Sequence, residues 1–141
     1  MSRARERTTV RAYGILVEDD RVLLVRSSNP EHVPPLWWLP GGGIEFAETP
    51  HDTLRREFAE ETGLLVRDPE LLEVTSDLRR RANGERLHTV RIIYRVARDG
   101  GELRDEAHGT TDRAQWFPLA EAVEMNLAAF ARDVLTRLYA K

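Results

Sequence analysis

The sequence contains no cysteine. Disulfides, thiolate metal sites and a cysteine nucleophile are therefore excluded. It also lacks any apolar run that approaches the roughly 18 residues of a membrane-spanning helix, and it shows no secretory signal. These absences lead us to expect a cytoplasmic protein that has no membrane partner.

Lysine is almost absent too. Lys141 is the only lysine among 21 basic residues, so the remainder are arginine. The formal net charge is −3, which provides no global attraction to nucleic acid. Arginine-rich composition is common in chains of biased codon usage, and we do not take it as an RNA-binding signal.

The length of 141 residues, with 41% hydrophobic and 32% charged residues, suits one globular domain with its own core. The start is short and basic, with Arg3, Arg5 and Arg7. We expect residues 1–8 to form a flexible N-terminal tail and residues 9–141 to form a single domain.

One helix can be bounded from its own signals. Thr49 is a favourable N-cap, Pro50 fits the first helical position, and Asp52 lies where a capping-box acid belongs. Gly63 can adopt the left-handed conformation that ends a helix. Helical spacing then predicts a buried stripe made of Leu54, Phe58 and Leu65.

Glu57, Glu60 and Glu61 are spaced i, i+3, i+4 on this helix. Like charges at this spacing cost a few tenths of a kcal/mol per pair, and hard oxygen ligands are what Mg²⁺ or Mn²⁺ prefers. An acidic helix alone is more often solvated surface. The spacing is therefore suggestive of a metal site without being decisive.

A glycine run lies directly upstream of the helix, in the segment Pro40-Gly41-Gly42-Gly43. We expect a flexible loop there, because glycine lets the backbone approach a metal ion or a phosphate closely. The glycine run and the carboxylates together favour a metal and phosphate site.

The segment from Gly42 to Leu64 resembles the signature of the Nudix family, written G-x5-E-x7-R-E-U-x-E-E-x-G-U with U a bulky apolar residue. Every fixed position is filled, and Phe58 is the one mild departure, since an aliphatic residue is commoner there. The matching residues are Gly42, Glu48, Arg56, Glu57, Phe58, Glu60, Glu61, Gly63 and Leu64.

The resemblance implies a role for each site residue. Glu57, Glu60 and Glu61 would bind Mg²⁺ or Mn²⁺, together with the carbonyl of Gly41. Glu57 would also be the general base or the group that orients water. Glu48 and Arg56 would pair with each other and brace the site.

Pattern and resemblance together predict an α/β fold, an α/β/α sandwich with a mixed β-sheet between helices. The strands are expected in the segments 9–17, 21–26, 71–78 and 87–97, with a short strand and turn at 115–119. Turns are expected at Asp19-Asp20 and Asn83-Gly84. A C-terminal packing helix would carry Leu127, Phe130, Val134, Leu135 and Leu138.

The residues that would contact substrate are marked less clearly. Arg26 ends a strand and could grip a phosphate, or it could be a surface arginine. One of Trp37 and Trp38 should lie in the core, which leaves the other, Trp38, to stack on a base or sugar. A late carboxylate is expected between residues 102 and 112; Glu106 is the first candidate, and Asp105 and Asp112 are the alternatives.

The resemblance implies a metal-dependent pyrophosphohydrolase, in which water attacks a phosphorus of a nucleoside diphosphate linked to another group. Nucleoside triphosphates, nucleotide sugars such as ADP-ribose, and dinucleoside polyphosphates all fit as small-molecule substrates. Capped RNA and a homodimer both stay open. The alternative is a non-catalytic sensor of the same fold that binds a nucleotide sugar.

Overall fold

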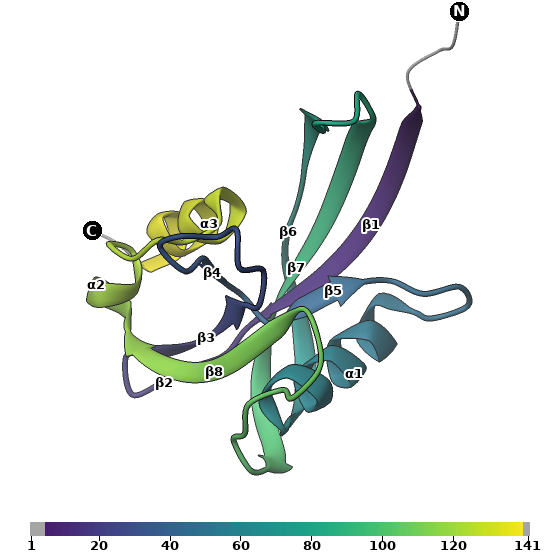
Figure 1. Cartoon of the computed structure of the whole chain (residues 1–141). Coiled ribbons are helices and arrows are strands. Elements are labelled where there is room, and N and C mark those ends of the chain that lie inside the picture. The colour runs from purple at the N-terminus through teal and green to yellow at the C-terminus, as the bar shows by residue number, and fades with distance from the viewer. Residues whose placement is uncertain (1–4, 140–141) are drawn as a thin grey trace, which may run out of the picture.

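The computed structural model describes residues 5–139. The strands of this part of the chain form two sheets (Figure 1). The mixed sheet has the order β5 (Gly41–Gly43), β1 (Glu6–Ile15), β7 (Arg86–Gly101), β6 (Leu64–Arg80), and β1 runs parallel to β7. The second sheet contains β2 (Val17–Glu18), β3 (Arg21–Ser27), β4 (Trp37–Trp38) and β8 (Thr111–Pro118). The helices are α1 (Pro50–Thr62), α2 (Leu119–Ala122) and α3 (Ala129–Tyr139).

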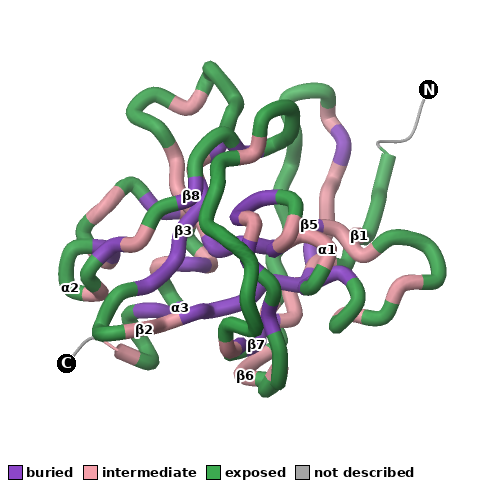
Figure 2. The backbone as a smooth tube through the Cα atoms, turned by 90° about the horizontal axis from the view of Figure 1, so that it is seen from below, coloured by how far each residue is buried: buried purple, intermediate pink, exposed green. Residues whose placement is uncertain are grey.

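Two hydrophobic cores lie on opposite sides of the strands. Phe58 of α1 is in one core with Leu23, and Leu135 of α3 is in the other with Leu24. Successive residues of β3 serve different cores because side chains alternate along a strand. The buried segments of β3 and β5 accordingly lie in the middle of the molecule (Figure 2). This arrangement confirms the predicted α/β class with helices on both sides.

Helix α1 has the predicted ends. The Thr49 hydroxyl accepts the Asp52 N–H at 3.1 Å, and the Asp52 carboxylate accepts the Thr49 N–H at 3.0 Å. Gly63 ends the helix with φ of 77°. Leu65 does not belong to the buried stripe, because β6 begins at Leu64 and alternation leaves Leu65 50% exposed.

The first strand and the glycine run differ from the prediction. Strand β1 begins at Glu6 and pairs with β7 from there, so residues 6–8 are not a tail; residues 1–4 lie outside the described residues. The glycines form strand β5 rather than a flexible loop. Gly41 is required here, because a Cβ atom would lie 2.2 Å from the carbonyl oxygen of Ala12.

Strands β6 and β7 form a hairpin longer than the predicted one, and it turns as predicted at Asn83-Gly84, where Gly84 has φ of 86°. The other predicted turn, at Asp19-Asp20, has positive φ at both residues, as tight hairpin turns require. The far half of the hairpin, with the start of β1, projects from the body (Figure 1). We call this three-stranded projection, residues 6–10, 74–80 and 86–90, the arm.

The C-terminal helix α3 packs on the second core through Val134 and Leu135, both 0% exposed. Leu127 is also buried but precedes the helix, and Leu138, predicted to pack, is 41% exposed. Within residues 5–139, no helix is long and apolar enough to cross a membrane.

Candidate active site

Glu61 is the most buried carboxylate of helix α1, with 1% of its surface exposed. Its Oε1 accepts the backbone N–H of Gly41 at 2.8 Å, which ties strand β5 to the helix. Burial raises the pKa of Glu61 to about 9, and the nearby negative charges of Glu57 and Glu106 add to the rise. This environment disfavours the ionised carboxylate when no cation is present.

Glu57 lies next to this buried carboxylate, one turn earlier on α1. Only 15% of its side chain is exposed, and burial raises its pKa. It packs against the glycine strand, since a Cβ atom at Gly42 would lie 2.7 Å from Oε1 of Glu57. A glycine is therefore needed at this position for the carboxylate to lie where it does.

Glu60 occupies the solvent side of the same helical face. Half of its side chain is exposed, and its Oε2 lies 3.5 Å from Nη1 of Arg56. The three carboxylates thus differ in burial: Glu61 is enclosed, Glu57 is partly buried and Glu60 meets solvent.

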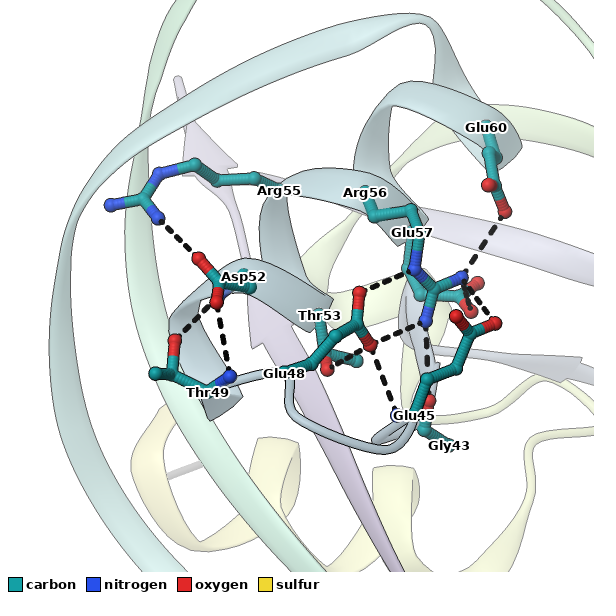
Figure 3. Close-up of polar contacts among 10 residues, drawn as sticks. All are labelled: Gly43, Glu45, Glu48, Thr49, Asp52, Thr53, Arg55, Arg56, Glu57 and Glu60. Atoms are coloured by element: carbon teal, nitrogen blue, oxygen red, sulfur yellow. Dashed lines mark hydrogen bonds and ion pairs between the residues drawn. The ribbon is translucent and has the colours of Figure 1, made fainter.

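Arg56 and Glu48 form a two-pronged ion pair (Figure 3). Nε and Nη2 of Arg56 donate to the two carboxylate oxygens of Glu48 at 2.8 and 2.9 Å. Glu48 also accepts the Thr53 hydroxyl and the Glu45 N–H, and these contacts hold its pKa at about 2, with the Arg56 bonds the largest cause. The pair fixes the segment between β5 and α1 against the helix.

The Arg56 guanidinium also contacts Glu57, a candidate metal ligand, and the glycine strand. Its Nη1 donates to Oε1 of Glu57 at 2.9 Å, and its Nη2 donates to the carbonyl of Gly43 at 3.3 Å (Figure 3). This cation offsets part of the negative charge, which stabilises the cluster as it stands.

The donor set fits a hard divalent cation in its chemistry. Among the described residues, no three acidic or histidine side chains converge into a ready-made metal site. The glutamates nevertheless offer carboxylate oxygens on a rigid helix. The buried carboxylate of Glu61 lies beside the backbone of Gly41 and forms no salt bridge with any residue in the range 5–139. Oxygen ligands of this kind suit Mg²⁺ or Mn²⁺.

Comparison with known proteins decides the family. The sequence profile of the NUDIX domain matches residues 6–138. This chain belongs to the Nudix hydrolase family. It is 36% identical over 107 residues to an ADP-ribose pyrophosphatase of Methanocaldococcus jannaschii, a match that covers 75% of this chain and 59% of that protein.

Two further Nudix relatives match over most of their length. A MutT-like protein of Streptomyces ambofaciens is 31% identical over 98% of this chain and 85% of its own. The crystal structure of a MutT NUDIX hydrolase from Burkholderia pseudomallei superposes with a TM-score of 0.78 at 29% identity, and covers 94% of this chain and 98% of that one. The Nudix fold is thereby confirmed.

The late segment carries the three candidate carboxylates Asp105, Glu106 and Asp112. Asp105 accepts the Ala114 N–H at 2.9 Å, and Asp112 accepts Nε of Arg26 at 2.8 Å, so both have structural partners. Glu106 accepts the Thr111 hydroxyl at 3.0 Å, and its charge acts on Glu61. The charge of Glu106 thus reaches Glu61, and the role of Glu106 as the late carboxylate stays a prediction.

Arg26 has two structural partners, Trp37 and Asp112. Its guanidinium lies 5.9 Å above the ring of Trp37 and pairs with Asp112. Trp37 packs edge-to-face on Phe117 in the α3 core, so Arg26 is on the side of the sheet away from α1. The contact of Arg26 with a substrate phosphate stays a prediction.

The two tryptophans lie on opposite faces of β4, as alternation predicts. Trp37 joins the α3 core, whereas Trp38 turns to the other side of β4, where it pairs with Val25 and meets His32 edge-to-face at 6.3 Å. His32 is held in turn by a 2.7 Å hydrogen bond with the Ser27 hydroxyl. Trp38 is partly buried and keeps some exposed surface.

One charged residue near the site escaped the sequence analysis. Arg11 of β1 pairs in register with Gly43, and its positive charge opposes the rise that burial causes in the pKa of both Glu57 and Glu61. Its Nε donates to the Tyr13 hydroxyl at 2.6 Å. No sequence signal marks Arg11, because its position depends on the pairing of β1 with a distant strand.

Proposed function

We propose that this Nudix protein is a metal-dependent pyrophosphohydrolase that cleaves the pyrophosphate of a nucleoside diphosphate linked to another group. The similarity to an ADP-ribose pyrophosphatase makes ADP-ribose the first substrate to test. Nucleoside triphosphates and dinucleoside polyphosphates come next, as the other small-molecule substrates that the family resemblance allows.

The burial of Glu61 beside Gly41 and Glu57 is the observation that carries the proposal. Ionised carboxylates are costly to bury unless a cation offsets them. Glu57, Glu60, Glu61 and the Gly41 carbonyl would hold Mg²⁺ or Mn²⁺. When bound, such an ion offsets charge on the pyrophosphate oxygens and lowers the pKa of a bound water.

Individual side chains of the protein have separate roles in the reaction. Glu57 accepts a proton from the attacking water, whose oxygen bonds to one phosphorus. The bridging P–O bond then breaks, and the bridging oxygen leaves with the other phosphate. Burial raises the pKa of Glu57 and so makes it a stronger proton acceptor. The pair of Arg56 and Glu48 keeps its helix in register with β5.

Charge supports the need for a cation. The chain has a formal net charge of −3, and the substrate is an anion, so the two repel at the glutamates unless a metal lies between them. Arg56 and Arg11 supply positive charge beside the cluster, but Arg56 is already engaged by Glu48.

The test is product release from ADP-ribose, nucleoside triphosphates and dinucleoside polyphosphates, each with Mg²⁺, Mn²⁺ or EDTA. We expect one substrate class to be hydrolysed only with a metal. Glu60→Gln should lose turnover by orders of magnitude, whereas Glu121→Gln, a matched change on the exposed surface of α2, should retain it.

Two outcomes would contradict the proposal. Equal turnover in EDTA would show that the reaction does not need a metal. A melting-temperature rise with ADP-ribose, without hydrolysis of any member of the panel, would favour the non-catalytic sensor.

A further inference from the structure

The outer edge of strand β6 is long and unpaired. Among residues 5–139, β6 pairs only with β7, so one edge of β6 carries backbone groups with no neighbouring strand. Such an edge is a template for pairing with another chain. From Glu73 to Arg80 the register with β7 runs without a bulge.

Three of the usual protections of a free edge are missing from this stretch. Natural edges are blunted by prolines, bulges, very short strands or charged side chains, and only the charges of Glu73, Asp77, Arg79 and Arg80 are present here. The only proline of β6 is Pro69, and its register shifts lie before Glu73. The stretch also exposes large aliphatic side chains: Val74 and Leu78 are each 58% exposed.

The sequence of this edge is complementary to itself. When two copies run antiparallel with Ser76 opposite Ser76, Val74 of one copy faces Leu78 of the other. Glu73 then faces Arg79, and Thr75 faces Asp77. Both apolar pairs lie on one face of the joined sheet and both Glu–Arg pairs lie on the other, since side chains alternate.

Neighbouring registers lack this match. Centring the pair one residue later, on Asp77, sets that carboxylate opposite itself, and centring it on Thr75 sets Glu73 opposite Asp77. Like charges directly opposite each other destabilise a sheet. The charge pattern therefore favours the Ser76 register over both of these neighbours. Centring the pair on Leu78 would also set Asp77 opposite Arg79, but it would leave residues 73–75 opposite residues beyond Arg80, where β6 ends.

We infer that two copies of this chain associate through the β6 edge, antiparallel about Ser76, and extend the mixed sheet across a two-fold axis. The interface is isologous, because each contact occurs twice with the roles exchanged. Backbone hydrogen bonds provide the affinity and the side-chain pairs fix the register. Both carboxylate oxygens of Glu73 already accept from Arg137, and 22% of the Glu73 side chain is exposed, so Arg79 of the second copy would share this acceptor with Arg137.

Charge reversal tests this geometry. Sedimentation velocity over a concentration series should show a dimer for the wild-type chain. Glu73→Arg and Arg79→Glu should each raise the dimer dissociation constant at least about tenfold, because each places like charges opposite each other twice. An equimolar mixture of the two variants should form a heterodimer, because both contacts become attractive.

The control is a matched pair of reversals away from the arm, Glu121→Arg and Arg21→Glu, both at exposed positions. These variants should dimerise like the wild type, alone or mixed. Amide exchange should slow with rising protein concentration within residues 73–80 and remain constant in β8.

Three results would overturn the inference. They are a wild-type chain that stays monomeric at several hundred micromolar, a mixture of Glu73→Arg and Arg79→Glu that stays monomeric, and control reversals that disturb the dimer equally.

Discussion

Without a bound metal, the stability of this protein should depend on pH through Glu61. The carboxyl group has a pKa of about 9 in the folded chain against an ordinary value of 4.5. Between these values it is protonated when folded and ionised when unfolded. Its contribution is fully present below the unfolded pKa and is lost as pH rises toward the folded pKa.

The size of the effect follows from linkage. Each pH unit in this window is worth about 1.4 kcal/mol, so raising the pH from 5 to 8 should lower the free energy of unfolding by roughly 4 kcal/mol. Little solvent screening applies, since Glu61 is 1% exposed. Glu61→Gln keeps an oxygen to accept the Gly41 N–H and cannot ionise, so it should remove most of this dependence.

The assay is urea unfolding followed by tryptophan fluorescence, in EDTA, at pH 5, 6, 7 and 8. Glu60→Gln is the matched control, because it removes a half-exposed carboxylate from the same helix, and it should follow the wild type. Parallel pH profiles for the wild type and Glu61→Gln would refute the reasoning. With Mg²⁺ at pH 8, the wild type should gain stability and Glu61→Gln should gain less.

Other predictions concern the neighbours of Glu61. Glu57→Gln should cut metal-dependent turnover of the identified substrate at least about 100-fold, yet leave the melting temperature in EDTA unchanged or higher. Arg56→Lys keeps the charge but loses the two-pronged contact with Glu48; urea unfolding should show a loss of about 1.5–3 kcal/mol, and a defect in turnover alone would contradict the bracing role. Gly42→Ala should lower turnover, with an unchanged circular dichroism spectrum, because its Cβ would lie 2.7 Å from Oε1 of Glu57. Dialysis against EDTA should abolish turnover, and added Mg²⁺ or Mn²⁺ should restore it.

Local signals allowed helix α1 to be predicted well. Thr49, Asp52 and Gly63 act through contacts with residues three or four positions away, so their spacing in the sequence is enough. The family resemblance predicted the pairing of Glu48 with Arg56, and the two residues form an ion pair.

Features that depend on distant pairing could not be predicted. Gly41–Gly43 become a strand only because β1 lies beside them, and Arg11 reaches the site for the same reason. The register of β3 with β4 places Arg26 and Trp37 on one face of the second sheet, but the sequence gives neither this register nor the face that meets α1. The unequal burial of the three glutamates likewise depends on how α1 packs against β5.

The parallel pairing of β1 with β7 also has a consequence for how the chain acquires its fold. Glu6 and Arg86, which begin this pairing, are 80 positions apart in the sequence. During synthesis, β1 cannot pair with β7 until most of the chain has been made. Both cores draw on β1, through Ala12 on one side and Tyr13 on the other, so neither can close early. Such high contact order predicts slow, all-or-none refolding, in roughly milliseconds to seconds.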